Sequence, residues 1–390
     1  MPRYNRKQKA IREIKESCKN FDEDLDQKIF DLEELALFDD RDTEIYNDMI
    51  DRYSLFIDHN KVEEDIVEDI ISYKYLYKGK NAIPKLVTKE NKLEFLENIG
   101  EDGFLKEIRM SKTSFNKLYN MVKDHAFYQS PATSKQIDVK LQLAIILEQL
   151  RSSGNDAAFS RIARRSGVGK GSIRNFILRF FSVMMSMEED FIFWSLEFEK
   201  QTIMKENEKP LGFPNLIGFL DGLYCGNILA DCDHNRKIRY LSTGYFGSSR
   251  DMRAIIKSSL RTNSERYFSK EQYVLADSRY KATNYVVPVC KKPRNQPMHK
   301  SNEKFNVYIA MMHVKIEYAF GILKERFYSL KSIPVQIKSE DDIRLVNSWI
   351  QACIILNNFL MDQVDDMMTI RIKSKWEALE FEEMRRLEEE

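Results

Sequence analysis

Three acidic residues occupy positions where carboxylates could do chemistry. Asp221 ends an apolar run, Asp277 ends the stretch "YVLAD", and Glu317 lies beside the apolar stripe of a long segment with helical spacing. Hard oxygen ligands of this kind hold Mg²⁺ or Mn²⁺. Paired ions, roughly 3.5–4 Å apart, can activate a water and stabilise the leaving oxygen in phosphoryl transfer. The three residues are therefore candidate catalytic residues and metal ligands.

Each of the three also has an ordinary structural interpretation. Asp221 precedes Gly222, and Asp-Gly is a common turn dipeptide. Asp277-Ser278 could cap a neighbouring element, and a glutamate within a helix usually lies in solvent. Spacing alone does not separate these alternatives from a metal site. Nucleophilic catalysis is less favoured, because none of the five histidines has a recognisable nucleophile context, and no glycine-rich phosphate loop is present.

Short strands and two long helices are expected to position the carboxylates. Runs rich in β-branched and aromatic residues predict four strands, at "NLIGFL", "YCGNILADC", "IRYLSTGYF" and "QYVLADS". A helix or turn is expected over residues 250–262, and a basic, proline-punctuated loop over residues 291–304. An apolar stripe predicts one long helix over residues 305–330, and residues 340–362 predict a second, buried helix.

The segment before the strands predicts helices. Ser111 could cap the second of two short helices, and three more are expected at residues 138–151, at residues 157–166 and from residue 170 onward. Ala163 stands four residues before Gly167, which is the pattern of a helix-turn-helix. Cationic and amide side chains at a helix start suit phosphate and base-edge contacts, although such helix pairs also occur in purely structural bundles. The residues predicted to contact DNA are Arg164, Arg165, Lys170, Ser172, Arg174 and Asn175.

Charge is unevenly distributed along the 390 residues, although the formal net charge is zero. Residues 21–70 hold 19 Asp and Glu against 4 Lys and Arg, so this segment carries −15 and the remainder +15. An acidic arm before a basic body fits a nucleic-acid binder in which the arm competes with DNA for the basic surface. The alternative is an acidic arm that only keeps the chain soluble. The length predicts two or three domains.

Membrane and secreted proteins are not expected from this composition. No stretch of about 18 apolar residues occurs, so a membrane is not an expected partner. Residues 1–20 lack the apolar segment of a secretory signal. The five cysteines form no CxxC pair, which indicates reduced thiols of an intracellular protein.

Four motifs resemble those of the PIF/Harbinger-type transposases and their domesticated relatives. They are "FLDG" (219–222), "GSSRDMR" (247–253), "LADSRY" (275–280) and "FNVYIAMMHVKIEYAFGILKERF" (305–327), and the resemblance spans roughly residues 104–360. It implies an RNase H-like nuclease fold and a DDE triad at Asp221, Asp277 and Glu317. It also implies cut-and-paste DNA transposition, a divalent metal (Mg²⁺ or Mn²⁺), a separate Myb-like DNA-binding partner and a location in the nucleus.

The chain departs from the family pattern at several positions. Arg250 stands where the family has His, Arg279 where it has Gly, and Lys281 where it has Pro. In the long helix, Ile309 and His313 replace the family's His and Arg, and Tyr224 stands where another His is expected. Asp251 remains, and His313 lies one helical turn before Glu317 and could pair with it. Asp251 and His313 are therefore candidate supporting residues.

The largest departure is a shortened segment after Asp221. Relative to the family pattern, about twenty residues are missing between the first Asp-Gly and the second strand, and the remaining connection could still close an antiparallel pair. It could instead shift Asp221 off the metal, and a displacement of about 1 Å at a catalytic group can cost roughly 10²-fold in rate.

These observations predict an α+β chain with an RNase H-like mixed sheet flanked by helices, preceded by an all-α region with the helix-turn-helix. The expected divisions are an acidic, partly disordered arm (1–100), a helical region (101–205), the nuclease-type domain (206–362) and a charged, exposed C-terminal helix (363–390). The function hypothesis is a transposase-like, metal-dependent DNA endonuclease. The alternative is a catalytically degenerate or domesticated relative that binds DNA or a protein. A homo-oligomer and a purely structural interaction role are left open.

Overall fold

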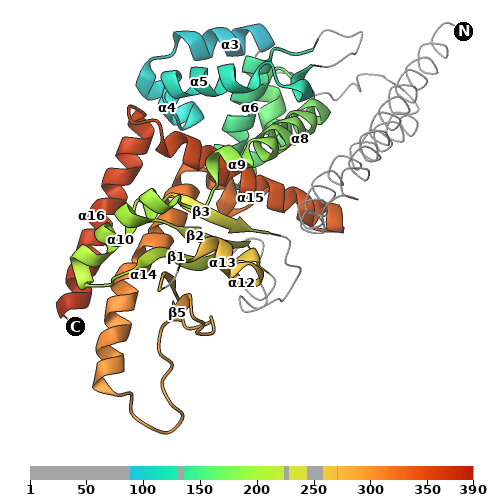
Figure 1. Ribbon diagram of the computed structural model, residues 1–390. Helices are drawn as coiled ribbons and strands as arrows, with labels where there is room; N and C mark the ends of the chain where they lie inside the picture. The colour runs from blue at the N-terminus through green and yellow to red at the C-terminus, as the bar shows by residue number, and fades with distance from the viewer. Residues whose placement is uncertain (1–87, 130–135, 224–227, 244–257, 270, 390) are drawn as a thin grey trace, which may run out of the picture. The chain divides into compact units, whose positions relative to one another are not determined.

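The computed structural model describes residues 88–390, apart from residues 130–135, 224–227, 244–257, 270 and 390 (Figure 1). Residues 84–390 form one compact unit, in which the helical region and the sheet belong together. The first described helix, α3 (Lys89–Asn98), is part of this unit, whereas the sequence interpretation assigned it to the acidic arm. The rest of the predicted arm, up to residue 87, lies outside the described residues.

A five-stranded mixed sheet forms the centre of residues 206–362, in the order β3-β2-β1-β4-β5; strands β3, β2, β1 and β5 are labelled in Figure 1. β1 pairs antiparallel with β2 and parallel with β4, while β2–β3 is antiparallel and β4–β5 parallel. The sheet with its flanking helices confirms the expected α+β, RNase H-like class. The strands are β1 (Leu216–Leu223), β2 (Ile228–Cys232), β3 (Ile238–Ser242), β4 (Tyr273–Ala276) and β5 (Val286–Pro288).

Two features of the sheet bear on the sequence interpretation. The short connection after β1 is compatible with an antiparallel pair, because Leu223 lies opposite Ile228 and Asp221 opposite Ala230. Asp221 therefore lies within a paired strand. The fifth strand is not predicted from the sequence, because it has three residues and ends at Pro288, too few to show an alternating pattern.

Helices cover both faces of the sheet. On one face, Phe219 and Leu275 share a hydrophobic core with Ile309 of α14 (Lys300–Arg326) and with residues of α15 (Glu340–Met361). The same hydrophobic core continues into the helical region, so it joins the sheet and the helical region into one unit. On the opposite face, Leu220 and Ala276 pack with an aromatic cluster beside α10 (Glu197–Leu211), α12 (Ser259–Thr262) and α13 (Ser264–Tyr267).

The helical region follows the expected pattern. Its centre is α6, which is buried from Leu141 to Leu150 and whose first turn is capped by Asp138. Gly167 turns the chain between α7 and α8 with a φ of 68°. A glycine suits this left-handed conformation because it carries no Cβ. The elements are α4 (Glu101–Ile108), α5 (Lys112–Val122), η1 (Ala126–Tyr128), α6 (Val139–Arg151), η2 (Gly154–Ala157), α7 (Phe159–Ser166), α8 (Lys170–Ser186) and α9 (Glu188–Phe191).

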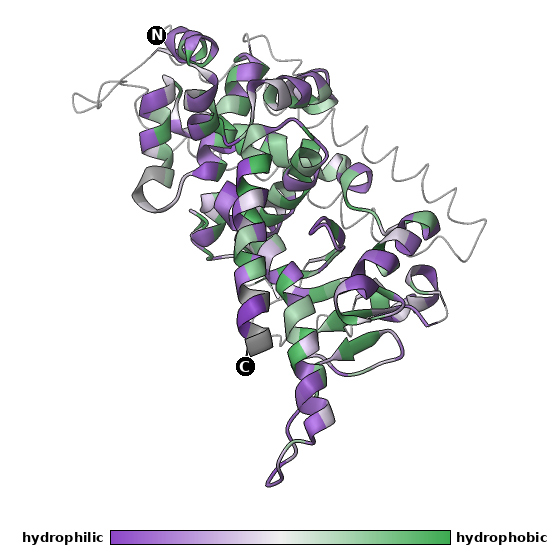
Figure 2. Cartoon of the chain, turned by 90° about the vertical axis from the view of Figure 1, so that its left-hand side faces the viewer, coloured by the Kyte–Doolittle hydropathy of each residue, from purple (hydrophilic) through white to green (hydrophobic). Residues whose placement is uncertain are grey.

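The two long helices are confirmed, with a different start for α14. His299 caps α14 by accepting a hydrogen bond from Ser301 N (3.3 Å), so the helix begins within the predicted loop. Its first turns are hydrophilic in Figure 2 and exposed, so apolar periodicity could not reveal them. The helix ends at Arg326 and the 3-10 helix η3 (Tyr328–Lys331) follows. No helix in the described part of the chain is long and apolar enough to cross a membrane.

The C-terminal helix α16 (Met367–Glu389) is not simply exposed, which corrects the sequence interpretation. Met368 and Ile372 are buried, and Trp376 packs over Gly321 of α14. These three α16 residues recur every fourth position, so they form one apolar face among many charges. Because Glu and Arg are abundant in this segment, its composition alone does not reveal the apolar face.

Candidate active site

The sheet places Asp221 and Asp277 side by side. β1 and β4 are parallel neighbours, and Leu220 lies opposite Ala276. Each aspartate directly follows its paired residue. Leu220 and Ala276 face the aromatic cluster, and successive strand residues point to opposite faces, so the aspartates point toward the face that α14 covers. This juxtaposition follows from the strand order, which the sequence does not display.

Asp221 is the more enclosed of the two. Its Oδ1 accepts a hydrogen bond from the backbone N of Gly222 (2.7 Å), and the residue is 9% exposed. Burial raises the pKa of Asp221, and the negative charge of Asp277 raises it further, while the Gly222 N–H, His313 and Arg279 oppose the increase. A carboxylate in this environment gains from a nearby cation, because burial disfavours its charged form.

Asp277 lies immediately after β4, at the mouth of the same site. Its Oδ1 accepts a hydrogen bond from the backbone N of Arg279 (2.7 Å), which closes an Asx-type turn. The hydrogen bond closes a local turn and leaves the carboxylate beside Asp221.

The side chain of Arg279 bridges the two aspartates. Arg279 Nε lies 2.5 Å from Asp277 Oδ2, and Arg279 Nη2 lies 3.2 Å from Asp221 Oδ1. In the sequence, Arg279 stands out only as a departure from the family pattern. Its contact with Asp221 spans 58 positions of sequence, so no local pattern could have revealed it.

His313 and Glu317 approach the site from α14. His313 is buried, with Nε2 3.4 Å from the backbone O of Leu220 and Nδ1 3.8 Å from Glu317 Oε1. Burial alone would lower the pKa of His313, but Glu317, Asp221 and the Leu220 carbonyl outweigh it and raise the pKa above its ordinary value. The predicted proximity of His313 and Glu317 is therefore observed, and His313 lies between Glu317 and β1.

The three predicted ligands differ in how far they enter the site. The exposed fraction of the side chain rises from 12% for Asp221 to 27% for Asp277 and 62% for Glu317. Among the described residues, no group of three or more His, Cys, Asp or Glu side chains is arranged to hold a metal ion. Asp221 and Asp277 nevertheless suit a cation, because together they already hold the guanidinium of Arg279. The structure thus brings two of the three carboxylates together.

The residues predicted to contact DNA lie in and before the first turns of α8. Lys170 and Arg174 are exposed, while Ser172 and Asn175 are half-buried. In α7, Arg164 and Arg165 are also half-buried, and Arg165 Nη1 lies 3.7 Å from Glu148 Oε1. The helix pair is present, and its use in DNA contact stays a prediction. Asp251, the other candidate supporting residue, lies outside the described residues.

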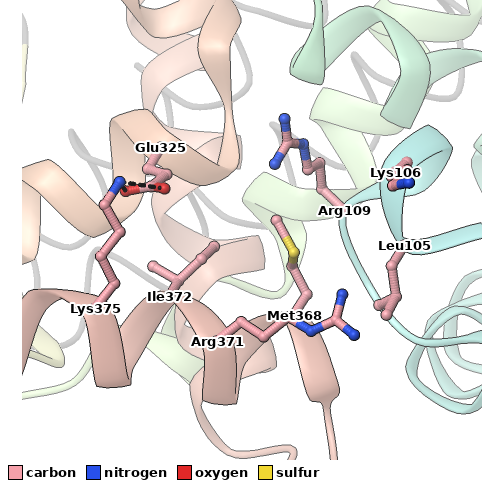
Figure 3. A pocket seen from close by; sticks show the side chains of 8 residues that line it. All are labelled: Leu105, Lys106, Arg109, Glu325, Met368, Arg371, Ile372 and Lys375. Carbon is pink, nitrogen blue, oxygen red and sulfur yellow. Dashed lines mark hydrogen bonds and ion pairs between the residues drawn. The ribbon is translucent and has the colours of Figure 1, made fainter. Parts of the chain in front are cut away.

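A cationic pocket of about 260 Å³ lies away from the predicted site residues, between α4, α14 and α16 (Figure 3). Two of its cations are partly neutralised, since Lys375 Nζ lies 2.8 Å from Glu325 Oε1 and Arg371 Nη2 2.8 Å from Asp102 Oδ1. Because its walls come from distant parts of the chain, no sequence motif marks it. The lining residues are Leu105, Lys106, Arg109, Glu325, Met368, Arg371, Ile372 and Lys375.

One family model matches part of this chain. Residues 221–358 match the model of a family described as DDE superfamily endonuclease. The match begins at Asp221, includes Asp277 and Glu317, and covers less than half of the chain. Searches of curated proteins and of solved structures found no match. At this coarse level the match supports a nuclease of the transposase kind with DNA as its substrate.

Proposed function

We propose that this chain is a metal-dependent DNA endonuclease of the transposase kind, which cleaves and transfers strands through Asp221, Asp277 and Glu317. The observation that carries the proposal is that Asp221 in β1 lies beside Asp277, which directly follows the neighbouring parallel strand β4, and that both face the helix that bears Glu317. The family match over the same residues supports it.

Four residues would have separate roles in such a site. Asp221 and Asp277 would hold Mg²⁺ or Mn²⁺, and Glu317 would complete the set from α14. The ion supplies stabilisation of the charge that develops on the phosphate oxygens. His313 would position Glu317, because it is buried beside β1 and its Nδ1 lies 3.8 Å from the Glu317 carboxylate.

DNA would be held outside the carboxylate site as well. Lys170, Ser172, Arg174 and Asn175 at the start of α8, with Arg164 and Arg165 of α7, would contact phosphates and base edges. The motif resemblance supports the finer proposals of PIF/Harbinger kinship, a Myb-like DNA-binding partner and a nuclear location, with self-association as a further proposal. Terminal inverted repeats around the gene would test the kinship directly.

The proposal predicts metal-dependent nicking of supercoiled plasmid DNA by the purified chain. Asp277→Asn and Glu317→Gln should abolish nicking, because each removes a negatively charged ligand. Glu303→Gln, an exposed position in the first turn of the same helix, is the matched control and should nick normally. Full nicking by both Asp277→Asn and Glu317→Gln would refute the assignment of the triad.

A second candidate is a catalytically degenerate or domesticated relative that binds DNA or a protein without cutting. The specific observation in its favour is the ion pairing of both aspartates with Arg279, together with the outward position of Glu317. It predicts DNA affinity that falls steeply with salt, as counterion release requires, and no nicking in any divalent metal.

A further inference from the structure

We propose that Arg279 is a built-in cation of the carboxylate site, which competes with a divalent metal ion for Asp221 and Asp277. The inference rests on the proposed function, because it concerns the same two carboxylates. It adds a residue that sets how tightly the site binds metal, and hence at what metal concentration the site fills.

Most of the oxygen atoms that a metal would need already face Arg279. The backbone N–H of Arg279 donates to Asp277 Oδ1 (2.7 Å), and its Nε donates to Asp277 Oδ2 (2.5 Å). Its Nη2 donates to Asp221 Oδ1 (3.2 Å), an atom that also accepts from Gly222 N. A metal ion held by both aspartates would therefore compete with the guanidinium for these oxygen atoms.

The chemistry of the guanidinium suits this place. It is always charged, and its donors diverge in a plane, so one group can serve two carboxylates at once. Two neighbouring carboxylates repel each other in a partly buried site. A cation between them relieves that repulsion, whether it is a metal ion or Arg279.

The position of Arg279 in the chain makes the competition local and reversible. Arg279 follows Asp277 by two residues, so its side chain is tethered beside the site at a high effective concentration. The side chain is also 50% exposed, so it can leave for solvent without disturbing the hydrophobic core. The backbone hydrogen bond to Asp277 does not depend on the side chain and would keep the turn in place.

The experiment measures Mn²⁺ binding to the purified chain by titration calorimetry, independently of nuclease activity. If Arg279 occupies the aspartates about nine-tenths of the time, the apparent affinity is lowered about tenfold. Arg279→Ala and Arg279→Gln should therefore each bind Mn²⁺ about tenfold more tightly than the unaltered chain, equivalent to about 1.4 kcal/mol. Arg266→Ala, an exposed arginine in α13, is the matched control and should bind as the unaltered chain does.

Two further measurements locate the effect. Thermal unfolding with EDTA and with Mn²⁺ should show that both Arg279 variants fold, and that Mn²⁺ raises their melting temperature more than that of the unaltered chain. Adding Asp277→Asn to Arg279→Ala should abolish the gain, because the gain requires the paired carboxylates.

The outcomes separate this inference from the proposed function. Equal Mn²⁺ affinity of the unaltered chain and both Arg279 variants would overturn the competition, while metal-dependent nicking by the unaltered chain would leave the endonuclease proposal standing. If no variant binds Mn²⁺ and none nicks DNA, both are refuted. A tenfold gain in both variants that disappears with Asp277→Asn supports the inference even if nicking remains weak.

Discussion

Gly321 of α14 lies directly under the indole of Trp376 in α16, so replacing it by alanine should destabilise the protein. A Cβ at this position would lie 2.6 Å from Trp376 Cζ2 and 2.7 Å from Cζ3, closer than side-chain atoms approach one another. The ring cannot move without loss, because it packs beside Tyr318 with centroids 5.1 Å apart and donates to Glu325 Oε2 (2.8 Å).

The expected magnitude combines two opposing effects. Alanine favours a helix over glycine by about 1 kcal/mol. Overpacking a fitted contact costs typically about 1–3 kcal/mol, and contact with an aromatic ring that is held on two sides belongs at the upper end of that range. The free energy of unfolding should therefore fall by about 1–2 kcal/mol after the helix gain is subtracted.

Urea denaturation of the whole chain is the assay, with Gly171→Ala as the matched control. Gly171 lies in α8, where an added Cβ would meet nothing within 4 Å, so this substitution should stabilise by up to about 1 kcal/mol. In a Trp376→Ala background, Gly321→Ala should become stabilising as well, because the obstructing ring is gone. If Gly321→Ala alone stabilises as much as Gly171→Ala, the packing of α16 on α14 has been misjudged.

Three other predictions concern acid stability, DNA affinity and the sheet edge. Burial opposes the charge of Asp366, but the N–H groups and charges around it prevail and lower its pKa below the ordinary 3.8. The contribution of Asp366 to stability is therefore present above about pH 4 and is lost as the pH falls through the folded-state pKa. Unfolding curves of Asp366→Asn should show a smaller loss of stability on acidification than those of the unaltered chain. Lys170→Ala and Arg174→Ala should each weaken DNA binding and reduce the salt slope by about one, measured by fluorescence anisotropy, whereas Lys209→Ala in α10 should do neither. Asn358 makes hydrogen bonds with both the N–H and the carbonyl of Ile238 at the start of edge strand β3 (3.2 and 2.7 Å). Asn358→Leu should therefore lower the free energy of unfolding by about 2–3 kcal/mol in urea titrations. An unchanged urea midpoint would mean that these hydrogen bonds contribute nothing to stability.

Local patterns predicted the secondary structure that carries the site. The strand that contains Asp221 and the strand that precedes Asp277 were visible as apolar runs, and the stripe around Glu317 indicated a helix. Such patterns arise because a strand or helix buries one face, and burial leaves a period in the residues that form it. They placed the candidate ligands on elements without showing the distances between them.

The features that the sequence did not reveal have different causes. The α16 helix looked exposed because its apolar face is narrow, and β5 was missed because three residues show no period. Asn358 and the cationic pocket of Figure 3 are also invisible in the sequence, because their partners lie far away along the chain. Contacts between residues far apart in the sequence leave no local pattern.

Residue types and spacing alone indicated carboxylates at strand ends, a long amphipathic helix and a helix pair with a glycine turn. These features depend on short stretches of chain, whose chemistry and periodicity are written in neighbouring residues. Only the folded arrangement brought Asp221 beside Asp277, put Arg279 across both and turned Glu317 toward solvent. Those relations depend on strand order and helix docking, which result from the burial of apolar surface over the whole compact unit.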